Sequence, residues 1–168
     1  MSDEASKRFE TREQVTEAMR KSHDLSGVNL NGLDLSGLRF AGFKMAGANL
    51  SETNLADAKF MGVDLSGANL SHAHMSRVKM MGINLQDADL TEADLGESRL
   101  LGVNVAGADW TGVDTTGARS MGVEWSQAKA PPEELPESIQ PPSWLPLLVV
   151  GIVALVLSRF MKKRRKRR

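Results

Sequence analysis

The sequence predicts a solenoid, a fold in which short repeats of the chain stack as successive coils around one continuous core. Between Asp24 and Ala128 a mostly apolar residue recurs at every fifth position, and the register never changes. A second small or apolar side chain lies two positions before most of these central residues. A repeat of five fits neither the period of a helix (about 3.6 residues) nor that of a strand (about 2), so we expect one corner per unit. The central residues are Leu25, Leu30, Leu35, Phe40, Met45, Leu50, Leu55, Phe60, Leu65, Leu70, Met75, Met80, Leu85, Leu90, Leu95, Leu100, Val105, Trp110, Thr115, Ser120 and Trp125.

Several units share a three-residue pattern of alanine, then asparagine or aspartate, then the central residue. These units include Ala48-Asn49-Leu50, Ala68-Asn69-Leu70, Ala88-Asp89-Leu90, Ala93-Asp94-Leu95 and Ala108-Asp109-Trp110. The pattern resembles the Ala-(Asp/Asn)-Leu-x-x consensus of the pentapeptide-repeat family, and the repeat continues over 21 units. The resemblance implies an all-β solenoid, a right-handed quadrilateral β-helix with about five coils over residues 24–128. At roughly 4.8 Å per coil such a rod would be about 25 Å long.

Residues 1–23 form an N-terminal segment in which we expect a capping helix. Thr11 and Gln14 have the spacing of a capping box, and the helix should continue to about Lys21. Val15 and Met19 then share one face of the helix. This face should cover the first coil and its unpaired strand edge.

The last coil is expected to be distorted or to act as its own cap. Thr115 and Ser120 are polar residues at central positions, and Trp110 and Trp125 are larger than most residues at those positions. Regular stacking should therefore weaken toward the C-terminal end of the repeat.

One column of the solenoid is expected to differ from the others on its outer surface. If four units form one coil, residues twenty apart stack, and one column carries a cation in every coil. The residue two positions later is apolar in each coil, beginning with Ala41, whereas elsewhere it is mostly small or polar. An apolar row beside a row of like charges is costly in water, so we expect a partner to cover both. The partner-binding candidates are Arg39, Lys59, Lys79, Arg99, Arg119, Met61, Met81, Leu101 and Met121.

Three other ways of covering these two rows remain open. The rows could face a membrane, because methionine adapts to many contact surfaces. The apolar row could also join two copies of the chain as a homo-oligomer. Finally, the chain could cover itself if the residues after the repeat fold back onto the column. The residues that could do so are Glu133, Glu134, Leu135, Glu137 and Ile139.

No catalytic or metal site is predicted, and no cofactor is expected. The sequence has no cysteine, which excludes thiolate metal ligands and cysteine nucleophiles. Its three histidines, His23, His72 and His74, form no recognisable arrangement with a nucleophile and a base, and two ligands do not complete a zinc shell. Columns of Asn and Asp, such as the one from Asn29 to Asp109, should bond neighbouring backbone groups. We therefore predict that the protein is not an enzyme.

The composition changes after Ala128, and three C-terminal segments follow. Residues 129–143 are a Pro/Glu-rich linker that should act as an extended spacer. Residues 144–161 are predicted to form a hydrophobic membrane helix, and residues 162–168 a basic tail that contacts lipid headgroups. The predicted membrane residues are Trp144, Leu147, Leu148, Val149, Val150, Ile152, Val153, Leu155, Val156 and Leu157, and the predicted headgroup residues are Lys162, Lys163, Arg164, Arg165, Lys166, Arg167 and Arg168.

These segments predict a membrane protein, single-pass or tail-anchored, with the repeat domain in the cytoplasm. The N-terminus lacks the pattern of a secretory signal, while the positive-inside tendency favours a cytoplasmic tail. A translocated tail, a re-entrant or interfacial helix and an exported rod therefore all remain open.

The predicted function is that of a non-catalytic, membrane-anchored scaffold or adaptor that mediates protein-protein interaction. The family resemblance allows an alternative, an acidic DNA-mimic rod that binds a type II topoisomerase, since residues 24–128 hold 13 acidic and 7 basic side chains. A second alternative is a surface or secreted repeat protein, because the C-terminal block looks like a sorting signal. Nucleic-acid binding by the tail is not expected, since lipid headgroups explain a basic run beside a hydrophobic helix more simply.

Overall fold

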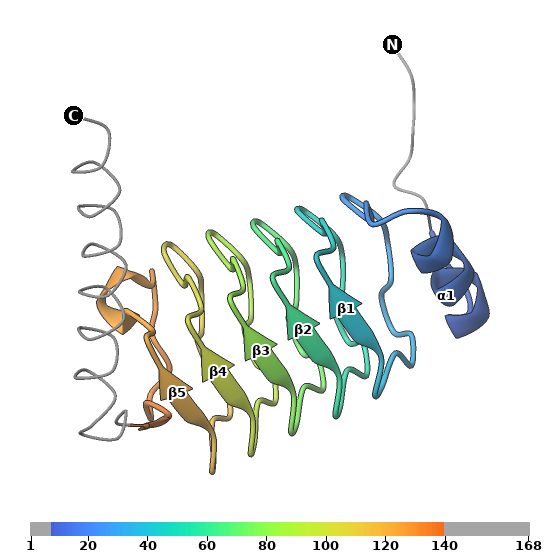
Figure 1. Ribbon diagram of the computed structural model, residues 1–168. Coiled ribbons are helices and arrows are strands. Elements are labelled where there is room, and N and C mark those ends of the chain that lie inside the picture. The colour runs from blue at the N-terminus through green and yellow to red at the C-terminus, as the bar shows by residue number, and fades with distance from the viewer. Residues whose placement is uncertain (1–7, 140–168) are drawn as a thin grey trace, which may run out of the picture. The chain divides into compact units, whose positions relative to one another are not determined.

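Residues 8–139 are described in a computed structural model of the chain, and most of them form a solenoid of stacked coils (Figure 1). Residues 1–7 and 140–168 lie outside this described part. The predicted membrane helix at 144–161 and the predicted basic tail at 162–168 therefore fall outside it. Among the described residues, no helix has the length and apolar character that a membrane span requires.

Each coil of twenty residues contributes one short strand to a parallel sheet. The strands pair in chain order, and in the first five strands each residue lies beside the one twenty positions later. At three other positions of each coil, single bridges join neighbouring coils with the same offset, as between Asp24 and Lys44. A coil therefore has four sides, which confirms the predicted all-β solenoid and its twenty-residue period. The strands are β1 (Arg39–Ala41), β2 (Lys59–Met61), β3 (Lys79–Met81), β4 (Arg99–Leu101), β5 (Arg119–Met121) and β6 (Glu137–Ser138).

The central residues fill a narrow core that runs the length of the solenoid. Every central residue from Leu25 to Trp110 is buried. Stacking brings equivalent side chains of neighbouring coils into contact, as with the rings of Phe40 and Phe60, whose centroids are 4.8 Å apart. Burial of one leucine side chain contributes about 1.5–3 kcal/mol, so this column of residues is the main source of stability.

The corners between the sides of a coil are of two kinds. At three corners the carbonyl oxygen of the central residue accepts a hydrogen bond from the N–H three residues later, as between Met45 and Ala48 (3.1 Å). The fourth corner follows each strand and contains Gly42 or its equivalent, and in residues 8–139 no such hydrogen bond closes it. The chain can therefore stay more extended on this side, which explains why the regular strands of the coils lie there.

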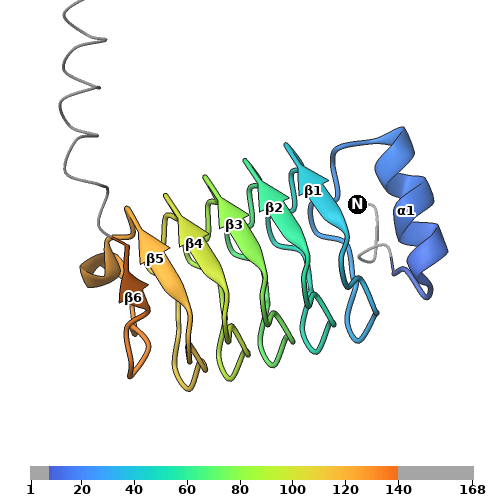
Figure 2. The same ribbon diagram turned by 60° about the horizontal axis from the view of Figure 1, so that its bottom comes forward.

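A short helix covers the N-terminal end of the solenoid (Figure 1 and Figure 2). Helix α1 (Arg12–Lys21) begins after Thr11, whose side chain accepts a hydrogen bond from the Gln14 N–H at 3.3 Å. The Gln14 side chain in turn accepts from the backbone N–H of Glu10 at 2.9 Å, one residue earlier than in the usual capping box. Val15 is fully buried in the core. The predicted capping helix is therefore confirmed.

The regular repeat ends after β5, where the chain leaves the path of the coils. A short 3₁₀ helix, η1 (Trp125–Gln127), replaces the expected next side. The Trp125 ring packs edge-on against Trp110, with ring centroids 4.9 Å apart. The predicted distortion of the last coil is confirmed.

Residues 129–138 do not act as a spacer, contrary to the prediction from their composition. Trp110 donates its backbone N–H to the Ala130 oxygen at 2.8 Å, and Arg119 of β5 pairs with Glu137 of β6. This segment adds a partial sixth rung to the exposed edge of the last coil (Figure 2). The prediction failed because proline prevents pairing only at its own position, and the paired residues Ala130, Glu137 and Ser138 are not prolines.

The buried hydroxyl of Ser98 provides a test of the core. Ser98, directly before β4, is buried, and its hydroxyl has no hydrogen-bond partner among the described residues. We predict that Ser98→Ala raises the free energy of unfolding by about 1 kcal/mol, because it removes a desolvated polar group. Thr53→Val is the matched control, since Thr53 is equally buried but donates to the Leu30 oxygen at 3.0 Å. Urea unfolding should show no stabilisation for the control, and a destabilised Ser98→Ala variant would contradict the prediction.

Candidate binding face

The outward side chains of β1 to β5 form one face of the solenoid, which we name the cationic face. Side chains alternate along a strand, so the central residue is buried and its two neighbours lie outside. Parallel pairing then places each cation beside the cation of the next coil, as with Lys59 and Lys79. At about 4.8 Å per strand, the whole row extends over roughly 19 Å. The row consists of Arg39, Lys59, Lys79, Arg99 and Arg119.

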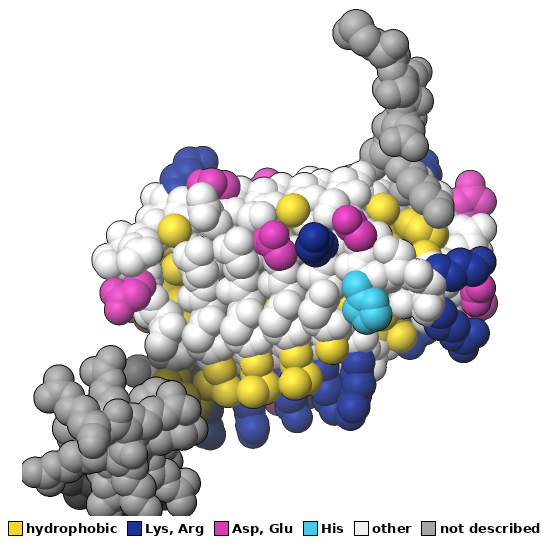
Figure 3. Space-filling model, turned by 45° about the horizontal axis from the view of Figure 1, so that its top comes forward, with side chains coloured by type: hydrophobic (Ala, Val, Ile, Leu, Met, Phe, Trp, Pro, Cys, Tyr) yellow, Lys and Arg dark blue, Asp and Glu magenta, His cyan; other side chains and the backbone are white. Residues whose placement is uncertain are grey.

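An apolar row lies directly beside the cations. Figure 3 shows hydrophobic side chains and Lys/Arg side chains as two adjacent lines along the solenoid. Met61 is 53% exposed and Met81 is 47% exposed. The structure thus brings all the partner-binding candidates together on one face. The apolar row consists of Ala41, Met61, Met81, Leu101 and Met121.

Positive charge is concentrated on this face. Residues 24–128 hold 7 basic side chains, five of which form the cation row, and none of the 13 acidic side chains belongs to it. Within residues 8–139 only one of the five cations forms an ion pair, from Arg119 Nε to Glu137 Oε2 at 3.3 Å. The other four face like charges on neighbouring strands, which is destabilising. An anionic partner would relieve this repulsion.

The segment after the repeat does not cover the two rows, contrary to one hypothesis from the sequence. Glu137 pairs with Arg119 only, and Leu135 is itself 57% exposed. Met61 and Met81 remain exposed in the middle of the face. The covering fails because β6 extends the sheet at its edge instead of lying on its outer surface. Among the described ion pairs, none joins the cation row to Glu133 or Glu134.

The edge of the face beside the apolar row is formed by glycine alone. Its corner residues have φ between 59° and 67°, the left-handed region. At other corners the same conformation is held by residues with side chains, such as Asp57 and Glu97. A Cβ on Gly42, Gly62 or Gly82 would meet no atom within 4 Å, so lack of space does not demand glycine there. The glycines leave the apolar row open from the side. They are Gly42, Gly62, Gly82, Gly102 and Gly122.

Sequence reasoning did not identify these glycines as one edge of the face. Their twenty-residue spacing was visible in the sequence. The contrast with the corners that carry side chains at positive φ appears only once the backbone conformation is known.

The opposite edge of the face carries acidic corner residues. Asp57 and Glu97 stand two positions before cations of the row. Arg77 lies between them and donates two hydrogen bonds to the Asp57 carboxylate, at 3.0 and 2.8 Å. These bonds hold the pKa of Asp57 below its usual value, and Lys79 of the cation row adds a smaller electrostatic effect. Arg77 thus neutralises Asp57, and among the described residues of this edge Glu97 is the carboxylate without an ion pair.

The Asn and Asp columns on the other sides bond the backbone, as predicted. The side-chain oxygen of Asn49 accepts a hydrogen bond from the Ser51 N–H at 3.1 Å, and equivalent bonds recur in other coils. Asp109 accepts from both the hydroxyl and the N–H of Thr111 and also pairs with Lys129. Together these contacts lower the pKa of Asp109 to about 2. These side chains therefore serve the fold.

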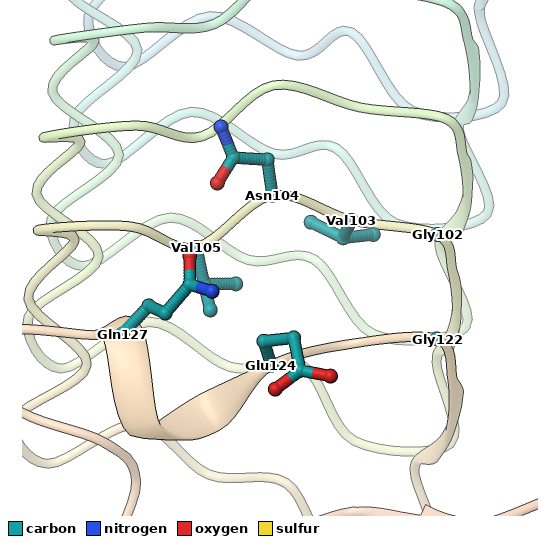
Figure 4. Close-up of a pocket in the computed structure, with 7 residues that line it drawn as sticks. All are labelled: Gly102, Val103, Asn104, Val105, Gly122, Glu124 and Gln127. Atoms are coloured by element: carbon teal, nitrogen blue, oxygen red, sulfur yellow. The ribbon is translucent and has the colours of Figure 1, made fainter.

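A depression near the C-terminal end offers no arrangement of a nucleophile and a base. It has a volume of about 280 Å³ and lies where the chain departs from the ladder, between Gly102–Val105 and Gly122–Gln127. Glu124 is the one ionisable residue of its lining, and Figure 4 shows the side chains of Asn104 and Glu124 pointing in different directions. In the part of the chain that the structure describes, no three His, Cys, Asp or Glu side chains could together hold a metal ion.

The sequence matches the family model for pentapeptide repeats, with 8 copies of the repeat over residues 24–60, 44–77, 58–96 and 79–114. The chain belongs to the pentapeptide repeat family. The matched stretches include four cations of the cationic face, and Arg119 lies beyond them. This pentapeptide repeat protein thus carries most of its candidate binding face within the matched repeats.

The solenoid is similar to solved structures of other pentapeptide repeat proteins. HetL of the cyanobacterium Nostoc sp. strain PCC 7120, which is involved in heterocyst differentiation regulation, is 23% identical, with a TM-score of 0.63. The match covers 66% of this chain and 47% of HetL, so the chain spans about half the length of HetL. At this identity the likeness supports the fold alone.

Two further structures from the same family are similar over comparable lengths. Rfr23 of the cyanobacterium Cyanothece 51142 is 20% identical, with a TM-score of 0.43, and the match covers 67% of this chain and 98% of Rfr23. A pentapeptide repeat protein of the Arabidopsis thaliana thylakoid lumen is 29% identical, with a TM-score of 0.29 and 60% of each chain covered. No curated protein matches the sequence.

Repulsion within the cation row predicts a salt-dependent stability. Lys79 lies between Lys59 and Arg99. We predict that Lys79→Gln raises the free energy of unfolding by about 0.5 kcal/mol at low salt and has little effect at about 1 M salt, where charges are screened. Lys44→Gln is the matched control, because Lys44 is an exposed cation whose column neighbours are aspartates. Thermal unfolding at both salt concentrations measures the effect, and a Lys79→Gln variant destabilised at low salt would contradict it.

The lowered pKa of Asp109 predicts a loss of stability in acid. Its pKa is about 2 in the folded chain, against an ordinary value of 3.8. The unfolded chain therefore binds more protons between these values, so the contribution of charged Asp109 is complete above about pH 4 and is lost as the pH falls toward 2. Asp109→Asn keeps an acceptor for Thr111 without the charge. We predict that it lowers stability near pH 7 and flattens the loss on the acid side, as measured by urea unfolding at several pH values. An unchanged slope in the variant would argue against this role.

Proposed function

We propose that this chain is a non-catalytic, membrane-anchored scaffold or adaptor that binds a protein partner through its cationic face. The observation that carries the proposal is the face itself, where four cations without an ion pair in residues 8–139 adjoin the half-exposed Met61 and Met81. Exposed methionines adapt to the shape of a partner, and uncompensated like charges favour an anionic one. Exposed apolar rows of this kind typically mark interaction surfaces.

The rigidity of the solenoid supports a role in presenting a surface. Backbone hydrogen bonds join neighbouring coils on all four sides, as between the Leu50 N–H and the Asn69 oxygen (2.7 Å). The face therefore keeps its shape without a partner. A preorganised surface of this kind loses little conformational entropy on binding.

The membrane part of the proposal is supported by the sequence alone. Residues 144–161 are largely apolar, and residues 162–168 are all basic. A helix of about this length can cross a thin bilayer, and basic residues near anionic lipid contribute about 1 kcal/mol each. The proposal places the protein at a membrane, single-pass or tail-anchored, with the repeat domain on the cytoplasmic side.

The distribution of charge argues against an acidic DNA-mimic rod that binds a topoisomerase. A protein that binds DNA is attracted to rows of negative charge, and a complete cationic face would repel it. Many of the aspartates on the other sides are also engaged with backbone N–H groups, as Asp94 is with the Gly96 N–H at 2.9 Å.

Site-specific photocrosslinking in native membranes tests the proposed partner site. A photoreactive residue in place of Met81 should give crosslinks to protein, whereas one in place of Gln86, exposed on another side, should not. Adding Lys59→Glu and Lys79→Glu should abolish the crosslinks at the face, because the charges that attract an anionic partner are reversed. Lys44→Glu is the matched control and should preserve them. Equal crosslinking at both positions, or no protein crosslinks at the face, would reject the proposal.

A further inference from the structure

We propose that the cationic face binds an acidic amphipathic α-helix of its partner, lying along the axis of the solenoid across β1 to β4. This inference rests on the proposed function and specifies the chemistry of the partner. One stripe of the helix supplies carboxylates to the cations, and the neighbouring stripe supplies apolar side chains to the Met/Leu row. The cations available to it are Arg39, Lys59, Lys79 and Arg99, because Arg119 already pairs with Glu137.

The spacing of the cations matches a helix better than a strand. Three steps between strands separate Arg39 from Arg99 by roughly 14 Å along the solenoid. Four carboxylates at helix positions i, i+4, i+7 and i+11 extend over about 16 Å. Four side chains on one face of a strand, at about 6.8 Å intervals, extend over about 20 Å. The helical carboxylates extend about 2 Å further than the cation row, a difference that long, flexible Lys and Arg side chains can bridge. The strand extends about 6 Å further than the row, which is too much for them.

The two rows of the face correspond to two neighbouring stripes of one helix. A cation and the apolar residue of the same coil are two positions apart on a strand, so the rows are separated by about 6.6 Å. Stripes that start at i and i+1 lie about 100° apart around a helix, so both can contact one flat surface. A single helix can therefore place carboxylates on the cations and apolar side chains on Met61 and Met81 at the same time.

The chain itself shows that a carboxylate can pair with the cation row. Glu137 of β6 holds Arg119 at 3.3 Å and leaves the other cations untouched. A partner with several carboxylates at the right intervals would extend this pairing along the row. A second copy of the same face would not fit, since two cation rows would repel each other.

The surroundings of the row favour a narrow partner over the surface of an anionic bilayer. Glu97 stands two positions before Arg99 at the corner of the face and has no ion pair among the described residues, whereas Asp57 on the same edge is paired with Arg77. A bilayer against the face would bring lipid phosphates close to the Glu97 carboxylate, whereas a helix about 10 Å across contacts the two rows alone. The glycine corners on the opposite edge leave room for a helix over the apolar row.

Binding of a designed peptide to the full chain, held in nanodiscs of neutral phosphatidylcholine, tests the inference. The probe is a peptide of about 18 residues with Glu at i, i+4, i+7 and i+11, Leu after each Glu, and Ala and Gln elsewhere. The control peptide has the same composition, but its Glu and Leu residues recur with the period of about two residues that is typical of a strand. Fluorescence anisotropy should show at least about tenfold tighter binding of the helical probe, and circular dichroism should show that it gains helicity.

Variants of the chain locate the bound probe. Lys59→Glu together with Lys79→Glu should weaken binding at least about tenfold, because attraction is replaced by repulsion. Met61→Ser with Met81→Ser should weaken it several-fold through lost apolar contact. Lys44→Glu is the matched control and should leave the affinity unchanged. Thermal unfolding of each variant verifies that the solenoid remains folded.

Four results would overturn the inference. Equal binding of the two peptides would show that charge is recognised without helical spacing. Unchanged binding by the Lys59/Lys79 variant would place the probe elsewhere. If the probe no longer binds in discs that contain phosphatidylserine, and Met61 and Met81 are then protected from oxidation, the face binds lipid instead of a helix. If the native partner crosslinks to the face through a non-helical segment, the proposed function stands and this inference alone fails.

Discussion

Parallel, in-register stacking of the coils is the constraint on which the rest of the structure depends. Each coil is bonded to the next on every side, as between the Leu55 N–H and the His74 oxygen at 2.7 Å, and each central side chain must remain inside. A coil cannot slip by a single residue without exposing its central residues. The same register that forms the core therefore also repeats the outer chemistry as straight columns.

Such columns place identical side chains beside one another, and residue types differ in how they tolerate this. An asparagine amide can both donate and accept, so Asn104 donates to Asn84 at 2.9 Å, and Asn84 donates to Asp64 at 3.0 Å. Lysine and arginine only donate and carry like charges, so stacking them has no internal compensation. The cationic face is therefore the column that folding explains least, which is why a binding role is its most economical explanation.

The five-residue period made the core and the composition of the cationic face predictable residue by residue, because a strict repeat fixes which side chains point outward. The spacing of Thr11 and Gln14 predicted the N-terminal cap. The sixth rung was not predictable. The pairing of Glu137 with Arg119 joins residues outside the repeat to an edge that exists only after the coils have stacked. For the same reason the exposure of Met61 and Met81 could not be derived from the sequence, since it depends on the path of the chain after residue 128.

Helix α1 and strand β6 occupy the two ends of the stacked coils in residues 8–139. Open edges of this kind allow strands of other molecules to add on and lead to polymerisation. A covering helix at one end and a two-residue edge strand at the other limit that route. The two ends also set how many rungs a ligand can engage. A bound segment longer than the face gains no additional contacts from it, and binding should therefore saturate at one segment per rod.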